Sequence, residues 1–192
     1  MTRRHALMPI TVTLLSGLGF LALAQEGTGS NISQLCDQLR CYAPRTIHIN
    51  MEDGAVASFD LDTPFPIVQG GEVIAIFPGD VIYLEAEVSD DRLVNIRAVE
   101  EPSGDTDFLE IKMWQEPGKS DTYLSLINHF SELIKYRAGM MLPAQDGIFA
   151  TSSCPVLDDG RVAFEHWGYP IFQLMLADFQ FIYPEGDSLV CE

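Results

Sequence analysis

Positive charge is scarce in this sequence. It has 11 Lys and Arg residues against 28 Asp and Glu, which gives a formal net charge of −17 at pH 7. A surface with this charge repels phosphate backbones and anionic lipid headgroups. The composition therefore excludes nucleic acid as a partner. It favours high solubility, with attraction of cations or basic proteins as the alternative explanation.

Catalytic and metal-binding motifs are also missing. The G-x-S-x-G turn of the α/β-hydrolases does not occur, and no two cysteines have C-x-x-C spacing. The four histidines are far apart, without the i,i+2 or i,i+4 pairs typical of zinc sites. We therefore expect a protein that acts by binding a protein partner, without a cofactor. The sequence predicts no oligomeric state.

The first 24 residues have the pattern of an export signal. Arg3 and Arg4 precede an uncharged, mostly apolar run over 6–23, and Ala-Leu-Ala at 22–24 fits the small-x-small cleavage pattern. The alternative is a retained membrane anchor, for which this run, interrupted by a proline and two glycines, is short. Cleavage removes two arginines and no acid, so the net charge becomes −19. We expect a periplasmic or secreted protein that leaves the membrane after cleavage.

Four cysteines follow the expected cleavage site: Cys36, Cys41, Cys154 and Cys191. An even number in an exported chain predicts two disulfides, although the sequence allows three pairings. We favour the pairing of neighbours, Cys36 with Cys41 and Cys154 with Cys191. In the chain-entropy model the longer loop contributes about 3–4 kcal/mol of stability.

Short strands separated by turn residues make up most of the chain after residue 45. Residues 25–45 are interpreted as an arm that carries the first cysteine pair, and 46–192 as one domain without linkers or repeats. Residues 46–61 predict a hairpin around a Glu-Asp-Gly turn, and 72–88 a second pair of strands around Pro-Gly-Asp. About eight to ten such runs, each roughly 8–12 residues after the last, predict an antiparallel β-sandwich.

Two segments fit either a helix or strands. Residues 121–139 have apolar side chains at helical spacing between Asp121 and Gly139, which slightly favours a helix over two strands. Residues 171–182 also show helical spacing, and a strand there needs a bulge near Ala177 and Asp178.

Three short motifs carry a resemblance. "LSLINHF…LIKYRAGMMLP", "TSSCPV" and "FEHWGYPIFQL" resemble a group of exported bacterial proteins that is uncharacterised and for which we expect an immunoglobulin-like fold. The resemblance covers about residues 107–182. It implies strands in place of the helix at 121–137, and we adopt that interpretation. It implies no catalytic residue.

Glu165 and His166 are the candidates for acid–base chemistry in the alternative, hydrolase-like interpretation. Adjacent residues on a strand point to opposite faces, so these two side chains converge only if the chain bends. Gly168 and Pro170 allow a bend just downstream. We expect instead that Glu165 and His166 complete the end of a strand.

Acidic turns are the candidates for calcium in a third interpretation, a calcium-stabilised surface module. Calcium takes six to eight oxygen ligands, and Glu100, Glu101, Asp105 and Asp107 concentrate carboxylates in one turn. Their spacing does not match the calcium loop of EF-hands. The prediction is therefore that these residues serve the turn and solubility, with calcium as the alternative.

Overall fold

The computed structural model describes residues 35–104, 107–158, 160–183 and 190–191. The protein is all-β. Its strands are β1 (Cys41–Tyr42), β2 (Arg45–Asn50), β3 (Val56–Leu61), β4 (Phe65–Pro66), β5 (Val68–Gln69), β6 (Val73–Ile76), β7 (Val81–Ser89), β8 (Arg92–Val99), β9 (Phe108–Gln115), β10 (Thr122–Asn128), β11 (Leu133–Met141), β12 (Phe149–Thr151), β13 (Val162–Trp167) and β14 (Gln173–Ile182). Within these residues, no helix is long and apolar enough to cross a membrane.

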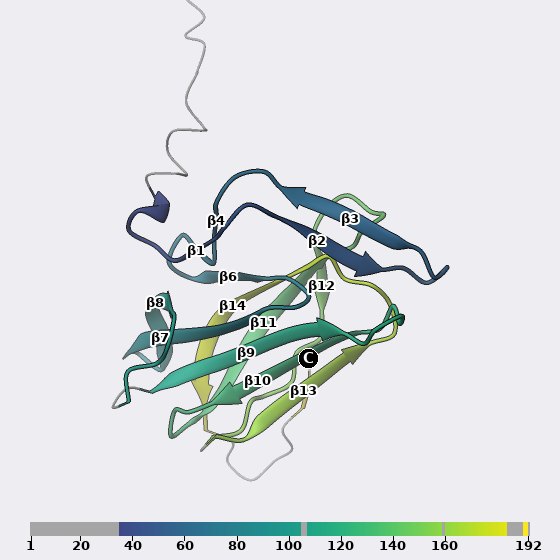
Figure 1. The fold of residues 1–192 in the computed structure, drawn as a ribbon. Coiled ribbons are helices and arrows are strands. Elements are labelled where there is room, and N and C mark those ends of the chain that lie inside the picture. Colours follow the sequence, from purple (N-terminus) through teal and green to yellow (C-terminus); the bar gives the residue numbers. More distant parts are fainter. Residues whose placement is uncertain (1–34, 105–106, 159, 184–189, 192) are drawn as a thin grey trace, which may run out of the picture.

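Ten of these strands form one antiparallel sheet. Its main path runs β12-β11-β14-β8-β7-β9-β10-β13, and β6 joins it through β14, with β5 beside β6. The sheet folds back on itself, so that β9, β10 and β13 lie in one layer and β11, β12 and β14 lie behind them (Figure 1). The expected antiparallel, two-layered β architecture is therefore present.

The two layers share hydrogen bonds through β8, which pairs with β7 and with β14. The ladder between β14 and β8 has a single paired position, Gln180 with Arg92. An immunoglobulin domain has two separate sheets instead. The immunoglobulin-like topology is not confirmed.

Both ambiguous segments are strands. Residues 122–128 and 133–141 form β10 and β11, and the chain reverses between them. In β14 the pairing with β11 shifts between Lys135 and Arg137, opposite Asp178, whose φ is 55°. This bulge lies where the strand interpretation requires it. The periodicity resembles a helix because one extra residue shifts the alternation of side chains.

Hairpin pairing was predicted correctly once and wrongly once. β2 and β3 pair from Arg45–Leu61 to Asn50–Val56, as the turn signal indicates. β6 and β7 are both strands around Pro78–Asp80 but pair with different neighbours, β6 with β5 and β14, and β7 with β8 and β9. The turn therefore carries the chain between strands that are not neighbours.

The core lies between the layers and follows the alternation of the strands. In β9 and β10, Leu109, Ile111, Met113, Leu124 and Leu126 are all at most 1 % exposed, while the residues between them face outward. Full burial of one such side chain stabilises the fold by about 1.5–3 kcal/mol. The pattern fixes which side chains of each strand remain at the surface.

Two disulfides join the cysteines in the favoured pairing, Cys36 with Cys41 and Cys154 with Cys191. Both are consistent with an oxidising environment. The first includes Cys41 of β1, which pairs with β4. Tyr42 of β1 donates a hydrogen bond from its hydroxyl to the carbonyl oxygen of Ala75. The expected export signal at 1–24 lies outside the described residues.

Candidate functional site

Glu165 and His166 lie on opposite faces of β13. Glu165 is 7 % exposed and points between the layers, whereas the His166 side chain is 47 % exposed on the outer face. The strand does not bend at this point, because β13 pairs with β10 in unbroken register through both residues. Glu165 and His166 therefore cannot act together on one substrate.

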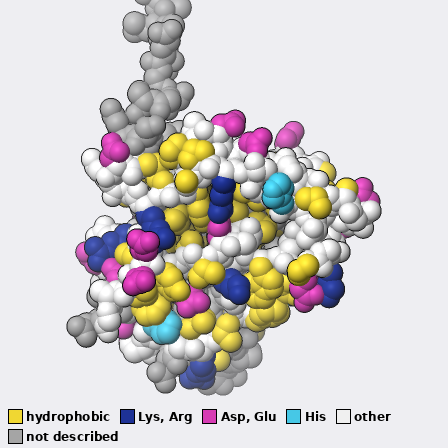
Figure 2. Space-filling view, viewed as in Figure 1, with side chains coloured by type: hydrophobic (Ala, Val, Ile, Leu, Met, Phe, Trp, Pro, Cys, Tyr) yellow, Lys and Arg dark blue, Asp and Glu magenta, His cyan; other side chains and the backbone are white. Residues whose placement is uncertain are grey.

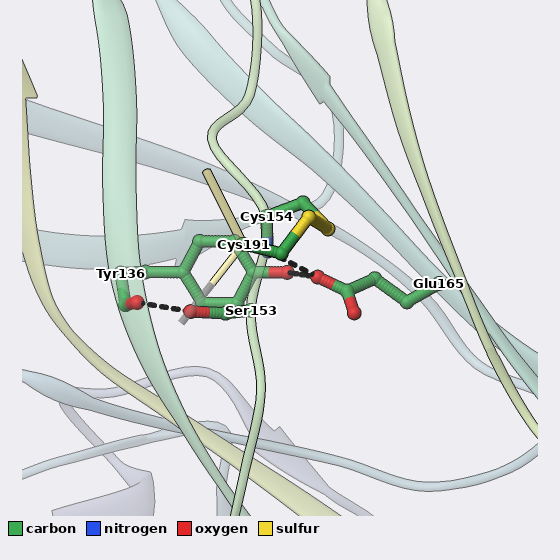
Figure 3. The surroundings of a disulfide bond; sticks show 5 residues. All are labelled: Tyr136, Ser153, Cys154, Glu165 and Cys191. Atoms are coloured by element: carbon green, nitrogen blue, oxygen red, sulfur yellow. Dashed lines mark hydrogen bonds between the residues drawn. A yellow bond between two sulfur atoms is a disulfide. The ribbon is translucent and has the colours of Figure 1, made fainter. Parts of the chain in front are cut away.

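Glu165 forms the centre of a buried hydrogen-bond cluster (Figure 3). Its Oε1 accepts a hydrogen bond from the hydroxyl of Tyr136 at 2.9 Å and another from the backbone N–H of Cys154 at 2.7 Å. Ser153 donates from Oγ to the backbone oxygen of Tyr136 at 2.5 Å, and Cys154 carries the disulfide to Cys191. We call Tyr136, Ser153, Cys154 and Glu165 the Glu165 seam.

The Glu165 seam is structural. Burial raises the pKa of the Tyr136 hydroxyl well above its usual value, and the neighbouring Glu165 carboxylate raises it further. Tyr136 therefore remains a neutral hydrogen-bond donor. The seam joins β13 to β11 and to the segment after β12, and Trp167 donates a further bond from Nε1 to Oγ1 of Thr151 at 2.8 Å. These contacts bring together β12 and β13, the two ends of the sheet path.

His166 belongs to a row of rings on the outer face. Trp114, Tyr123 and His166 are opposite one another on β9, β10 and β13, with ring centroids 5.5 and 4.8 Å apart and planes within 19°. His166 also lies 2.9 Å from the carboxylate of Asp121. This hydrogen bond is the main cause of the lowered pKa of Asp121. Cross-strand stacking of this kind stabilises the pairing of β13, the end strand of the sheet.

Apolar side chains also gather on this outer face, over β9, β10 and β13 (Figure 2). Val162 and Phe164 of β13 are 55 % and 56 % exposed. The rings of Trp114 and Tyr123 stack against each other, so the face does not offer them as one flat platform. Nothing on this face indicates the chemistry of an occupant.

The calcium candidates do not form a site in the described part of the chain. Glu100, Glu101 and Asp107 are all exposed, and Asp105 lies outside the described residues. Among the residues with a described position, no group of three or more His, Cys, Asp or Glu side chains is placed to hold a metal ion.

The strongest candidate is an apolar pocket at the end of the hairpin β2–β3, which we call the hairpin pocket. Its volume is about 650 Å³, within the range of small-molecule pockets. Its wall comes from three segments distant in sequence: the hairpin end at 51–57, the end of β11 with the following loop at 140–145, and 169–170 before β14. Most of the lining is apolar: Met51, Ala55, Val56, Ala57, Met140, Leu142, Pro143, Ala144, Tyr169 and Pro170.

The walls of the hairpin pocket are anchored to the core. Met51, Met140, Leu142 and Tyr169 pack against buried core side chains, and the Tyr169 hydroxyl lies 3.5 Å from Sδ of Met140. The hairpin turn closes at Gly54, whose φ of +83° favours glycine. A pocket with fixed walls needs little reorganisation when it is filled.

The hairpin itself is held to the main sheet at both ends. Arg45 forms a bidentate ion pair with the buried Asp80, at 2.7 and 2.6 Å. At the other end of β2, Gln115 accepts a hydrogen bond from the backbone N–H of Asn50 at 2.8 Å and donates one to its carbonyl oxygen at 3.2 Å. The hairpin wall is therefore fixed relative to β9 and to the turn before β7.

The charged groups that line the hairpin pocket are acidic. Glu52 and Asp53 lie in the exposed hairpin turn, and no Lys or Arg is among the lining residues that the structure describes. The Asp53 carboxylate accepts a hydrogen bond from the backbone N–H of Ala55 at 3.0 Å, which fixes its position at the turn. The pocket thus combines an apolar interior with negative charge at its rim.

Sequence reasoning missed the hairpin pocket. Met140 and Tyr169 have the pattern of core residues, and Glu52 and Asp53 that of a turn. One signal in the sequence was Val56, an apolar residue beside the tight Glu-Asp-Gly turn. In the structure this valine is 58 % exposed.

Comparisons with protein families, with curated proteins and with solved structures find no match to this chain.

Proposed function

We propose that this is an exported binding protein without catalytic activity, periplasmic or secreted, whose hairpin pocket receives an apolar side chain of a protein partner. The observation that carries the proposal is an apolar pocket of about 650 Å³ whose charged lining residues are both acidic. Apolar anchors that fill preformed pockets supply much of the affinity in protein interfaces. The two cysteine bridges fit the oxidising compartments outside the cytoplasm.

Charge complementarity defines the chemistry of the partner. Glu52 and Asp53 at the rim, in a chain with net charge −17, favour a segment in which Lys or Arg flanks the apolar residue. The same charge disfavours acidic segments and fatty-acid carboxylates. We therefore assign the pocket to a basic–apolar peptide segment of a partner protein.

The test is fluorescence polarisation with short synthetic peptides that carry Phe, Leu or Met between lysines. We expect saturable binding that weakens when the apolar residue becomes Ser or when the lysines become Glu. Val56→Arg places a positive charge at the pocket and should weaken binding by about tenfold or more, by repulsion and by blocking. Val81→Arg is the matched control, because Val81 is another exposed strand valine, 44 % exposed and not among the pocket residues.

Three results would overturn the proposal. The first is equal loss of peptide binding in Val56→Arg and Val81→Arg, which would mean that net charge alone governs the interaction. The second is binding that does not depend on the apolar residue. The third is no binding by any peptide of the set. Glu52→Gln tests the acidic rim separately. It should weaken the binding of the lysine peptides and leave the binding of neutral apolar peptides unchanged.

A further inference from the structure

The outer edge of the hairpin β2–β3 has no neighbouring strand within the described ranges. β3 belongs to a two-stranded sheet with β2, paired from Arg45–Leu61 to Asn50–Val56. β2 is the strand held to the rest of the protein, through Arg45 and Asn50, so β3 is the outer strand of the hairpin (Figure 1). A strand with a free edge presents unpaired N–H and C=O groups to which another strand can bind.

The register shows which backbone groups of β3 face this free edge. The N–H of Met51 donates to the carbonyl oxygen of Ala55, so these two residues form a hydrogen-bonded pair at the end of the hairpin. In an antiparallel ladder, such pairs alternate with pairs that are not hydrogen-bonded. The odd-numbered residues of β3 therefore bond to β2, whereas the N–H and C=O groups of Val56, Ser58 and Asp60 point to the free edge.

β3, all of whose residues are described, lacks the usual protection of an edge strand. Natural edges are commonly protected by Pro, Lys or a bulge. The sequence of β3, VASFDL, contains neither Pro nor Lys, and its register with β2 is continuous. Its inward side chains, Ala57, Phe59 and Leu61, are only partly buried, whereas Ile47 and Ile49 of β2 are at most 4 % exposed. A strand added beside β3 would cover these side chains.

The hairpin pocket lies on the same side of the hairpin as this free edge. Its lining takes residues 55–57 from the start of β3, and no residue of β2 among those that the structure describes. Its opposite wall comes from 140–145 and 169–170. A strand added to β3 would run between β3 and this wall, and its side chains opposite Ala55 and Ala57 would enter the pocket. One partner segment can therefore place its apolar anchor and pair its backbone at the same time.

Charge favours a basic partner segment over a second copy of this chain. The hairpin at 46–62 contains four acids, Glu52, Asp53, Asp60 and Asp62, and no Lys or Arg. Asp53 and Asp60 accept hydrogen bonds from an N–H and from a hydroxyl, neutral donors that do not cancel the negative charge. Two β3 strands side by side would bring these acids together, whereas a segment with Lys or Arg complements them.

We propose that the basic–apolar segment of the partner binds as an extended strand paired with β3, with its apolar anchor in the hairpin pocket. The inference rests on the proposed function and adds the conformation of the partner segment, which must be long enough to lie opposite Val56–Asp60. On a strand, residues that flank an inward apolar residue point outward, so the flanking lysines lie on the face where Asp60 is exposed. A helical segment can fill the pocket but cannot pair with β3.

The first test uses the lysine–apolar peptide that binds most tightly in fluorescence polarisation, remade with one backbone N-methyl group at each position in turn. N-methylation removes one donor and keeps the side chain. Because every second amide of a paired strand faces its neighbour, we expect binding to weaken by about tenfold or more at alternate positions and by less than about threefold between them. Equal effects at all positions would overturn strand pairing and leave the pocket proposal intact. Absence of binding by every unmodified peptide would overturn both.

Hydrogen exchange measured by nuclear magnetic resonance tests the same pairing from the side of the protein. Peptide binding should slow the exchange of the Val56, Ser58 and Asp60 amides by about tenfold or more, because these amides become hydrogen-bonded. The amides of Ala57 and Phe59 already bond to β2 and should change less. Binding that leaves the exchange of Ser58 and Asp60 unchanged would contradict the proposal.

A substitution at Ser58 removes one donor from the free edge. Ser58→Pro deletes an N–H that does not bond to β2, and Ser58→Ala is the matched control because both variants lose the contact with His48 but alanine keeps the N–H. Ser58→Pro should weaken peptide binding by about tenfold and Ser58→Ala by less than about twofold. Urea unfolding checks that both variants fold, and equal binding by the two folded variants would overturn the proposal. If Ser58→Pro does not fold, the methylated peptides and the exchange measurement decide.

Discussion

The Glu165 seam makes a sharp prediction about stability. Glu165→Ala removes the acceptor of two buried donors, the Tyr136 hydroxyl and the Cys154 backbone N–H. A buried donor left without a partner costs about 1–3 kcal/mol, so the substitution should cost about 2–6 kcal/mol. Because a domain is stable by only about 5–15 kcal/mol, this loss is a large share of the total.

Glu165→Gln is the matched variant. Both hydrogen bonds end on the same oxygen, Oε1, so a glutamine carbonyl oxygen can accept both in the same position. Charge-assisted bonds become neutral ones, but a buried charge is also removed, and we expect a net change within about 1–2 kcal/mol. Tyr136→Phe removes one of the two donors and should cost less than Glu165→Ala.

The assay is equilibrium unfolding in urea with both disulfides intact, followed by tryptophan fluorescence. The expected order of stability is wild type, then Glu165→Gln, then Glu165→Ala. If glutamine destabilises the protein as much as alanine does, the carboxylate charge matters and the acceptor argument is wrong. If Glu165→Ala lowers the free energy of unfolding by less than about 1 kcal/mol, water replaces the acceptor and the Glu165 seam is not a buried hydrogen-bond cluster.

Two further predictions concern ion pairs. Arg45→Met leaves the Asp80 carboxylate, 8 % exposed, without its bidentate partner. Because the Arg45 side chain is itself 36 % exposed, we expect the free energy of unfolding in urea to fall by about 2–3 kcal/mol. The control Arg161→Gln breaks an exposed ion pair and should lower it by less than about 0.5 kcal/mol. Equal losses would show that the pair does not anchor the hairpin. The second prediction concerns Asp121, whose pKa is lowered in the folded protein. The Asp121 carboxylate therefore contributes to folding stability above the ordinary carboxyl pKa of 3.8, and this contribution is lost as the pH falls through the lower folded-state pKa. The difference in stability between wild type and Asp121→Asn should therefore become smaller on acidification below pH 3.8, which unfolding curves recorded at several pH values can measure. A difference that stays constant with pH would contradict the role of the carboxylate.

Local patterns predicted those features that depend on neighbouring residues. The hairpin at 46–61 and the opposite faces of Glu165 and His166 follow from turn chemistry and alternation. The bulge at Asp178 is the one that the strand interpretation of 171–182 requires, although the sequence left that segment open between helix and strand. The same alternation places Glu165 on the inward face, and this signal could have predicted a buried carboxylate in need of donors.

The rest depends on contacts between segments far apart in sequence. The separation of β6 from β7 is decided by β14, about a hundred residues later, whose pairing with β6 no local pattern encodes. The hairpin pocket likewise needs three segments, and each of them alone has an ordinary core or turn pattern. Burial does not distinguish a core methionine from one that lines a cavity.

Strand β14 has a consequence for the order of folding. It pairs with β6, β8 and β11, so it is the strand through which both layers are connected, and it is the last strand of the described chain. Partial chains that lack it can still pair β8, β7, β9, β10 and β13, but β6, β11 and β12 are then not joined to those strands, and such non-local pairings form slowly. We therefore expect the two layers to join, and the core between them to close, only after residue 182 has been synthesised.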